Sequence, residues 1–552
     1  MSALAGVGVG RGIAAAKVLR MPEPLAPPSD EPLAADVDAE HARVQQALAH
    51  VADELNARAA AAGGEAQQVL EAAALMAQDP AILDDVRSRL DGGANAEKAT
   101  WDAYAQFREM LTAMGGYMAE RATDLDDVAQ RVVARLRGVA APGVPVSDEP
   151  FILVARDLAP ADTATLDLER TLALVTQEGG PTSHTAILAR SKSLPAVVGV
   201  VGLLDAAADG QRAIVDARAG TVELDPDDAS VDAALAEREA RLAAASAPIT
   251  AGALADGTEV PLLANVGSPK DAAAAVAAGA EGVGLFRTEF LFLDASSAPS
   301  VEQQTASYTE LLQAFPGKKV VARVLDAGAD KPLSFLNDAH EENPALGLRG
   351  IRALRANEAI LRDQLTALAN ADAATDAELW VMAPMIADVE EAEYFVALGR
   401  ELGLKVVGAM AEVPSIAVVA DQVVEACDFV SIGTNDLTQY TLAADRQLGS
   451  VAALQDPWHP AVLRLVKMLG DAGARAGKPV GVCGEAAADP ALAVVLVGLG
   501  VTTLSMSASA IADVRAELLT VTLGQARARA ERVLGARSAA DARQLAAAVA
   551  AG

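Results

Sequence analysis

FVSIGTND, at residues 429–436, joins a short apolar run to the polar start of a helix-compatible segment. Seven more apolar, β-rich runs share this arrangement, each followed by a helix-compatible stretch: 260–266, 282–286, 319–325, 379–385, 405–410, 479–483 and 502–506. Eight such units within roughly 300 residues match the number and length of a (β/α)8 barrel. The sequence therefore predicts a parallel TIM barrel in the second half of the chain.

The most reactive residues of this half stand at or just after the ends of the predicted strands. They are Arg287 after the second run, Arg323 near the end of the third, Glu412 after the fifth, Asn435 and Asp436 after the sixth, and Cys483 at the end of the seventh. Active sites of TIM barrels are built at the carboxyl ends of the strands. We therefore expect these side chains to surround one active site.

The first half of the chain has other patterns. Apolar residues spaced four and three apart from about residue 36 to 138 predict a bundle of roughly four helices. Short β-rich runs between residues 151 and 224 predict a small α/β unit. The charged, alanine-rich stretch 225–246 predicts a helical linker.

Composition limits the functions that the chain can have. Its 552 residues exceed one typical core, so we expect two or more domains. Lys and Arg number 44 against 75 Asp and Glu, and the net charge of −31 argues against a nucleic-acid partner. Two cysteines form no disulfide framework, which favours a reducing cytoplasm. Gly, Thr and Ser interrupt the uncharged run 490–512, which predicts a short helix and a buried strand instead of a membrane span.

A second motif, GGPTSHTAI, lies at residues 179–187. The glycine pair permits a tight turn, Thr182 or Ser183 can cap the helix that follows, and His184 stands where free helix amides stabilise a phosphate. A nucleophilic imidazole at an anion site suits covalent phosphoryl transfer. The alternative for His184 is a buried, hydrogen-bonded histidine in a helix cap.

GGPTSHTAI at 179–187 and FVSIGTNDLTQY at 429–440 together resemble Enzyme I of the bacterial phosphotransferase system, the phosphoenolpyruvate-protein phosphotransferase. The resemblance covers essentially the whole chain. It implies the following domains: a phosphohistidine α/β domain at 1–29 and 142–224, an α-helical insertion at 30–141, a helical linker at 225–248 and a phosphoenolpyruvate-binding TIM barrel at 249–552.

The resemblance also implies a reaction and its partners. His184 is expected to take the phosphoryl group of phosphoenolpyruvate, to become phosphohistidine, and to pass the group to a histidine of the phosphocarrier protein HPr. Pyruvate is released, and the phosphorylated carrier starts sugar uptake. The helical insertion is expected to bind HPr, and the barrel is expected to form a homodimer.

Phosphoenolpyruvate brings a carboxylate and a phosphate, about three negative charges, to an acidic protein, so its site needs several cations. The candidates are Arg287, Arg323, Arg349 and Arg446. Enzyme I resemblance assigns substrate binding to Arg287, Arg323 and Arg446, and Arg349 is the added fourth; Asn435 and Asp436 complete the expected substrate site. A surface salt bridge is the alternative for any one of these arginines.

Two further roles concern the metal and the proton. Glu412 and Asp436 can present carboxylate oxygens to one Mg²⁺, as at other phosphate sites, and the resemblance makes both of them metal ligands; the alternative is a pair of helix caps. The enolate left by phosphoryl transfer must gain a proton, which the Cys483 thiol can donate if burial keeps it protonated. Inert packing is the alternative for Cys483, and it suits Cys427.

Two other readings and two departures from the family pattern bear on the function. A relative of pyruvate phosphate dikinase or phosphoenolpyruvate synthase would need a further ATP-binding domain, and a non-catalytic signalling or scaffold protein would be expected to lack one of the site residues. Gln177 stands where the family commonly has Asp, and residues 327–331 read AGADK instead of the common IGGDK. The second change lies near the phosphate-binding loops and could alter affinity.

Overall fold

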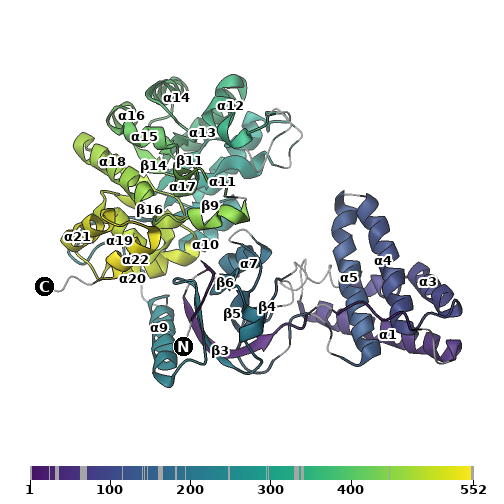
Figure 1. The fold of residues 1–552 in the computed structure, drawn as a ribbon. Helices are drawn as coiled ribbons and strands as arrows, with labels where there is room; N and C mark the ends of the chain where they lie inside the picture. Colours follow the sequence, from purple (N-terminus) through teal and green to yellow (C-terminus); the bar gives the residue numbers. More distant parts are fainter. Residues whose placement is uncertain are drawn as a thin grey trace. The chain divides into compact units, whose positions relative to one another are not determined.

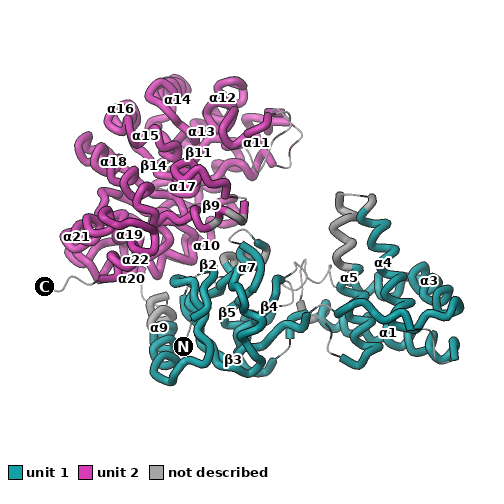
Figure 2. The backbone as a smooth tube through the Cα atoms, in the orientation of Figure 1, with its two compact units in different colours: residues 1–240 teal, residues 241–552 magenta. Residues whose placement is uncertain are grey.

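The computed structural model describes residues 3–548 except 11, 24, 32–35, 63–70, 115, 140, 142, 146, 159–165, 181–182, 193, 246–248, 294, 296, 328–332, 334, 337–340 and 447. The chain divides into two compact units, residues 1–240 and residues 241–552, coloured teal and magenta in Figure 2. Each unit has its own clusters of buried apolar residues. Each therefore has what a domain needs in order to fold by itself.

Part of the first unit is an eight-stranded sheet with the order β1-β8-β7-β3-β4-β5-β6-β2. β3, β4, β5 and β6 are parallel, and the other neighbours are antiparallel. The strands are Leu4–Ala5 (β1), Val7–Val9 (β2), Ile13–Arg20 (β3), Phe151–Ala155 (β4), Thr171–Thr176 (β5), Ala196–Val198 (β6), Arg212–Asp216 (β7) and Thr221–Leu224 (β8).

Helices accompany both faces of this sheet. α7 (His184–Lys192) contributes Ala186 and Ala189 to the apolar cluster of one face, and α8 (Leu203–Ala206) contributes Leu203 to the cluster of the other. α9 (Asp228–Ala245) follows the last strand, in the stretch for which the sequence predicts a helical linker. β-rich runs in the sequence predicted β4 to β7, whereas β1, β2, β3 and β8 were not predicted as strands.

Four helices of the described residues form a separate bundle in the first unit (Figure 1): α1 (Val37–Ala62), α3 (Pro80–Asp91), α4 (Ala96–Met114) and α5 (Gly116–Arg137). Val44, Leu48, Val51 and Leu55 are buried along α1 at the predicted four-and-three spacing. Pro80 opens α3 directly after Asp79, whose side chain accepts a hydrogen bond from the amide of Ala81. The predicted helical bundle is present.

The second unit contains a closed barrel of eight parallel strands. The strands are Leu262–Val266 (β9), Val283–Arg287 (β10), Lys319–Arg323 (β11), Glu378–Ala383 (β12), Val407–Ala411 (β13), Val430–Ile432 (β14), Val480–Val482 (β15) and Thr503–Met506 (β16). Each of the eight predicted runs overlaps one of these strands. The expected fold class, mixed α/β with a (β/α)8 TIM barrel, is confirmed.

Helices follow the barrel strands and bury their apolar faces against them. They are α10 (Ala272–Ala277), α11 (Val301–Gln313), α12 (Ile351–Ala356), α13 (Glu358–Ala373), α14 (Val389–Glu401), α15 (Pro414–Val418), α16 (Ala420–Ala426), α17 (Thr434–Leu442), α18 (Pro460–Ala476), α19 (Pro490–Gly498), α20 (Ile511–Leu518), α21 (Leu523–Leu534) and α22 (Ala539–Ala547). The uncharged run 490–512 holds α19 and the buried strand β16, as predicted. Among the described residues, no helix combines the length and the apolar character needed to cross a membrane.

Candidate active site

Residues from five strands lie at one end of the barrel. Arg287 and Arg323 are the last residues of β10 and β11 and pair with each other in register. Glu412 directly follows β13, Asp436 lies in the first turn of α17 after β14, and Cys483 directly follows β15. Parallel strands of a closed barrel all end on the same rim. The structure therefore brings these residues together.

Alternation along the strands points three of these side chains into the barrel. Val321, Met410 and Cys483 belong to a small cluster of interior residues that is distinct from the core between strands and helices. Arg323 stands two residues after Val321, and Glu412 stands two residues after Met410. Because successive side chains of a strand point to opposite faces, Arg323 and Glu412 share the inner face with this cluster.

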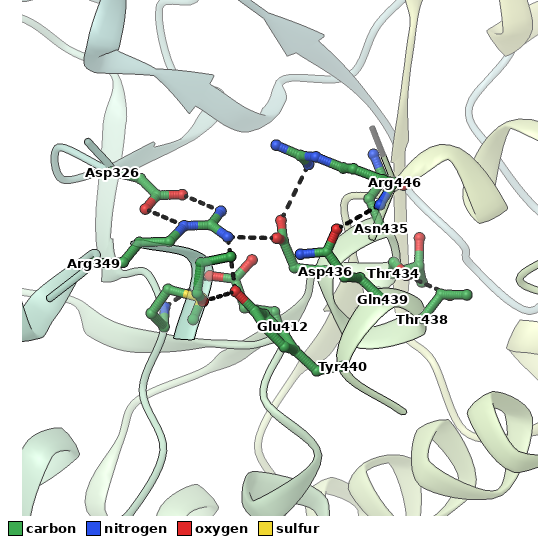
Figure 3. A network of polar contacts seen from close by, with 12 residues as sticks. Asp326, Arg349, Glu412, Thr434, Asn435, Asp436, Thr438, Gln439, Tyr440 and Arg446 are labelled. Carbon is green, nitrogen blue, oxygen red and sulfur yellow. Dashed lines mark hydrogen bonds and ion pairs between the residues drawn. The ribbon is translucent and has the colours of Figure 1, made fainter. Parts of the chain in front are cut away.

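Arg349 lies at the centre of a polar network at this rim (Figure 3). Its Nε and Nη2 donate to the two carboxylate oxygens of Asp326, at 3.2 and 3.0 Å. Its Nη1 donates to Oδ1 of Asp436 at 2.8 Å and to the hydroxyl of Tyr440 at 3.0 Å. These contacts hold the guanidinium in one orientation, because an arginine fork bound to a carboxylate by two parallel bonds cannot rotate freely.

Arg446 approaches Asp436 from the other side. Its Nη1 lies 3.5 Å from Oδ2 of Asp436, so this carboxylate stands between two guanidinium groups. The backbone amide of Arg446 donates to Oε1 of Gln439 on α17 at 2.9 Å. Asn435 lies beside Asp436, and its Oδ1 accepts a hydrogen bond from the amide of Glu485 at 3.2 Å. The segment after β14 therefore positions three of the predicted site residues.

Arg323 is buried between two acidic side chains. Its Nη2 donates to Oε1 of Glu289 at 2.8 Å, and its Nη1 lies 3.2 Å from Oδ2 of Asp326. Burial acts to raise the pKa of Asp326, but the charges of Arg323 and Arg349 outweigh it and hold that pKa below its ordinary value. Asp326 therefore stays ionised and links the two arginines.

Glu412 is completely buried. Its Oε1 accepts a hydrogen bond from the amide of Met385 at 2.7 Å, and Met385 has a φ of 58°, which is unusual for a residue other than glycine. Burial, reinforced by the carboxylates of Asp436 and Asp326, raises the pKa of Glu412 to about 8. The backbone therefore holds Glu412 at a place where burial and two carboxylates outweigh the charges of Arg323 and Arg349.

Several buried polar atoms at this end have no hydrogen-bond partner among the described residues: Nε of Arg323, Oε2 of Glu289, Oε2 of Glu412 and Oγ1 of Thr434. Buried polar atoms are nearly always paired in native proteins, and unpaired ones point to a ligand, an ion or a water. The rim therefore offers both donors and acceptors to a polar ligand.

The carboxylates at the rim fit a divalent cation that is also held by substrate and water. Oε2 of Glu412 is free, and a Cβ on Gly433 would lie only 2.8 Å from it, so glycine keeps this space open. In the part of the chain that is described, no three His, Cys, Asp or Glu side chains could hold a metal ion by themselves. Magnesium at phosphate sites uses only one or two protein carboxylates, which matches Glu412 with Asp436.

Cys483 belongs to the cluster of residues in the barrel interior, and 2% of its surface is exposed. Its Sγ donates to the carbonyl oxygen of Ile432 at 3.5 Å, and its own carbonyl accepts from Nδ2 of Asn265 at 3.0 Å. Burial raises the pKa of the Cys483 thiol to about 11, although a hydrogen bond from Ser431 and the nearby arginines act to lower it. The thiol is therefore protonated at neutral pH.

His184 is the first residue of α7, in the first unit. Oγ of the preceding Ser183 accepts a hydrogen bond from the amide of Ala186 at 3.3 Å, so Ser183 acts as a cap of this helix, whereas Thr182 lies outside the described residues. Gly179 has a φ of 91°, which the predicted tight turn requires. Cap and glycine turn together leave His184 at the amino-terminal end of the helix.

One of the two departures from the family pattern has a visible consequence. Oε1 of Gln177 accepts a hydrogen bond from the amide of Leu204 in the first turn of α8, at 3.1 Å. An amide oxygen can satisfy that orphan helix donor as a carboxylate would. Of the second departure, only Ala327 is described; residues 328–331 lie outside the described residues.

Sequence reasoning missed Asp326, Glu289, Tyr440 and Asn265 as site residues. Asp326 follows Arg323 by three positions, in the loop directly after β11, which was a usable signal. Asn265 is the polar residue within the apolar run of β9, and its Oδ1 accepts from Oγ of Ser505 at 2.6 Å. A partly buried amide in a barrel strand needs such partners, so its presence indicated a polar interior.

Three family models match consecutive parts of the chain. The PEP-utilising enzyme, N-terminal model matches residues 5–121. The PEP-utilising enzyme, mobile domain model matches residues 147–220. The PEP-utilising enzyme, PEP-binding domain model matches residues 242–523, which hold the barrel and its polar rim.

Curated relatives match almost the full length. The phosphoenolpyruvate-protein phosphotransferase of Streptomyces coelicolor is 53% identical, over 100% of this chain and 99% of its own. Those of Haloferax volcanii and Bacillus subtilis are 41% and 38% identical, over 91% and 97% of this chain and the same shares of their own lengths. With such identity over whole chains, this protein belongs to the family of phosphoenolpyruvate-protein phosphotransferases, Enzyme I.

Proposed function

We propose that this chain transfers the phosphoryl group of phosphoenolpyruvate to His184 and from there to a histidine of the phosphocarrier protein HPr, for sugar uptake, with release of pyruvate. The family supplies the class of reaction, which is phosphoenolpyruvate-dependent phosphotransfer. One observation supports the part of the proposal that concerns phosphoenolpyruvate and pyruvate: four arginines and the carboxylates of Glu412 and Asp436 gather near a buried, protonated thiol.

Substrate binding rests on the arginines of the rim. The guanidinium of Arg349 has five N–H donors. Its bonds to Asp326, Asp436 and Tyr440 use four of them, which leaves one for a substrate. Arg287 is exposed, and about a third of the Arg446 side chain is exposed, so these two can reach an incoming anion. We therefore assign Arg287, Arg323 and Arg446 to direct contact with phosphate and carboxylate, with Arg349 and Asn435 completing the site.

Glu412 and Asp436 would hold Mg²⁺ at this rim. The ion would supply positive charge beside the phosphate and the developing enolate oxygen. Glu412 is fixed for this task by the amide of Met385, which occupies one carboxylate oxygen and leaves Oε2 for the ion. Asp436 is fixed by Arg349, which also stops its charge from repelling the substrate.

Phosphoryl transfer and protonation use different residues. His184 attacks the phosphorus atom, and the bond between phosphorus and the enolic oxygen breaks. Cys483 then gives its proton to C3 of the enolate that this leaves, which makes pyruvate and turns the thiol into a thiolate. The raised pKa of Cys483 suits this task, because a general acid has to start protonated.

Cys483→Ser is expected to slow pyruvate formation by roughly 10²-fold or more, because a hydroxyl is a much poorer acid than a thiol. Exchange of phosphate between His184 and the carrier should keep its rate, since no carbon atom is protonated in that step. Cys427→Ser is the matched control: Cys427 is equally buried and burial raises its pKa to about 12, but it follows α16 on the outside of the barrel. Pyruvate formation at the wild-type rate in Cys483→Ser would return Cys483 to a packing role.

We place the docking surface for HPr on the helical bundle of α1, α3, α4 and α5. Leu75, between α1 and α3, and Met110 on α4 are 73% and 52% exposed, and a docked partner would cover such apolar side chains. We also assign the contacts of a homodimer to the barrel and the reaction to the cytoplasm.

The division into two units predicts two separable activities. A fragment ending at Ala247 should exchange phosphate with the carrier but not react with phosphoenolpyruvate, because it lacks the barrel rim. A fragment beginning at Ile249 should bind phosphoenolpyruvate, and isothermal titration would measure this. Phosphoenolpyruvate-dependent labelling of the first fragment alone would overturn this division.

The proposal is tested by counting products. Enzyme, phosphoenolpyruvate and magnesium without carrier should release about one pyruvate per chain and then stop, because a covalent phosphohistidine accumulates. Adding carrier should restart pyruvate release, with one phosphorylated carrier formed for each pyruvate. Continuous pyruvate release without carrier would contradict the proposed acceptor.

A further inference from the structure

The inner face of β11 carries a cation at each end of the barrel. Lys319, Val321 and Arg323 alternate with residues whose side chains pack outside the barrel. Arg323 belongs to the active-site rim, whereas Lys319 is the first residue of the strand and lies at the opposite, amino-terminal end. Nζ of Lys319 lies 3.7 Å from the ring centroid of Trp380, and that ring lies 4.8 Å from the ring of Phe429.

A small pocket, in which the volume open to the centre of a water molecule is about 10 Å³ and so suffices for about one water, occupies this amino-terminal half of the barrel interior. Its lining includes Lys319, Phe429, Ser431, Gly481, Thr503 and Ser505. A Cβ on Gly481 would lie 2.5 Å from Oγ1 of Thr503, so the glycine keeps the space open. Hydroxyl groups from β14 and β16 thus face a space in which a water molecule, about 30 Å³ in the liquid, has polar partners.

Ser431 connects this pocket to Cys483. Ser431 pairs in register with Gly481, and Cys483 follows two residues later on the same inner face of the barrel. Ser431 acts to lower the pKa of the Cys483 thiol, as expected of a hydroxyl group close to the sulfur. The thiol itself donates to the carbonyl oxygen of Ile432. The hydroxyl of Ser431 therefore lies between the sulfur and the pocket.

The ammonium group of Lys319 can lose and regain a proton near neutral pH. It lies in an aromatic environment, and burial lowers its pKa to about 8. Glu378, which pairs with Lys319 in register at the start of β12, acts in the opposite direction. Lys318 points to the other side of the strand, where its Nζ donates to the carbonyl oxygen of Ala280 at 3.2 Å.

We propose that this pocket is a proton inlet, through which Cys483 regains its proton from Lys319 by way of a water molecule and Ser431. The inference rests on the proposed function, in which Cys483 has become a thiolate. Ser431 gives its hydroxyl proton to the sulfur and takes one from the water, the water takes one from the Lys319 ammonium, and the amine takes one from bulk solvent. Every group of the relay returns to its original protonation state, and a proton from solvent has replaced the one that Cys483 gave to pyruvate.

A proton route from the opposite end of the barrel is needed because the rim is closed to water during phosphoryl transfer. During transfer, the substrate and the incoming histidine must exclude water there, because water would hydrolyse the phosphohistidine. Cys483 is 2% exposed, so a substrate or pyruvate bound at the rim, as proposed, would block its route to solvent on that side. A route from the opposite end of the barrel lets the thiol recover independently of product release.

Rapid-quench measurement of pyruvate tests the inlet, by comparing the first turnover with the steady state under excess carrier. Lys319→Met keeps the apolar stem over Trp380 but carries no proton, and Lys319→Arg keeps the positive charge but cannot release a proton. Both variants should form the first pyruvate at the wild-type rate, because Cys483 starts protonated, and should turn over roughly tenfold more slowly afterwards. Ser431→Ala should behave in the same way, and Lys318→Met is the matched control.

The outcomes separate the inlet from a structural or electrostatic role. Steady-state rates equal to wild type in both Lys319 variants overturn the inlet. Restoration by Lys319→Arg but not by Lys319→Met overturns it as well, because charge alone then accounts for the effect. Partial rescue of Lys319→Ala by a small primary amine in the buffer supports it, since such a molecule can occupy the space that the lysine side chain leaves and carry the proton.

Failure of the proposed function gives a different result. If the wild-type enzyme forms no phosphohistidine, or if Cys483→Ser keeps the normal first turnover, the proposed chemistry is wrong whatever the Lys319 variants do. If both of those controls behave as proposed and the ratio of first to later turnovers does not change in the Lys319 variants, only the inlet is wrong.

Discussion

Asp436→Ala is expected to abolish phosphorylation of His184 by phosphoenolpyruvate, with a loss of at least about 10³-fold in rate. The carboxylate takes part in three interactions of the proposed site at once. It binds Arg349 at 2.8 Å, it lies 3.5 Å from Arg446, and it would hold magnesium together with Glu412. Its removal leaves two guanidinium groups without their common partner and the ion with a single carboxylate. Labelled phosphoenolpyruvate and a phosphohistidine assay would measure the loss.

The reverse direction is the control for this variant. Phosphorylated carrier should still label His184 in Asp436→Ala, because that step uses no group of the barrel rim. Asp421→Ala removes a carboxylate that pairs with Arg475 on the protein surface and should leave both directions unchanged, as exposed ion pairs contribute little. An equal loss of both directions in Asp436→Ala would indicate misfolding or a different role for Asp436.

His184→Ala is expected to remove phosphoryl transfer in both directions completely, since no other residue of the proposed mechanism accepts the group. The variant should still bind phosphoenolpyruvate, because His184 lies in the first unit and the rim lies in the second. Thermal unfolding with and without phosphoenolpyruvate and magnesium would measure that binding, as a ligand of the native state raises the midpoint.

His50→Ala is the matched control for this variant. His50 is an exposed residue of α1, far along the chain from the site residues, and its removal should leave phosphoryl transfer from phosphoenolpyruvate unchanged. Labelling of His184→Ala by either donor would show that another residue is the acceptor.

The barrel could be predicted because each of its strands is a short apolar run with a helix behind it. The ends of the strands were less predictable. The fourth run was expected to extend to Met385, but β12 ends at Ala383, and Met385 adopts a positive φ so that its amide reaches Glu412. That conformation is set by a partner 27 residues away in the sequence, and no local pattern of apolar residues encodes it.

The identity of the site residues was more predictable than their contacts. Residue type and position after a strand indicated Arg323, Glu412, Asp436 and Cys483. The bonds that orient them join residues far apart in the chain, such as Arg349 and Asp436, which are 87 positions apart. Such pairings arise only when the barrel closes.

The first strands of the α/β domain show the same limit. β1, β2 and β3 lie in a stretch rich in Gly and Ala, whose β propensity is low, and they are fixed by pairing with β8, β6 and β7. Because the partners come about 200 residues later in the chain, the pairing decides the structure of this stretch and its composition does not.

The central claim, that His184 carries the phosphoryl group between phosphoenolpyruvate and the carrier, is tested most directly by locating the label. The enzyme is incubated with phosphoenolpyruvate bearing a labelled phosphate and with magnesium, then digested under alkaline conditions and analysed by mass spectrometry. The account predicts one acid-labile phosphate on the imidazole of His184, which leaves when unlabelled carrier is added. An acid-stable label, or a label on any other residue that the carrier removes at the same rate, would contradict it.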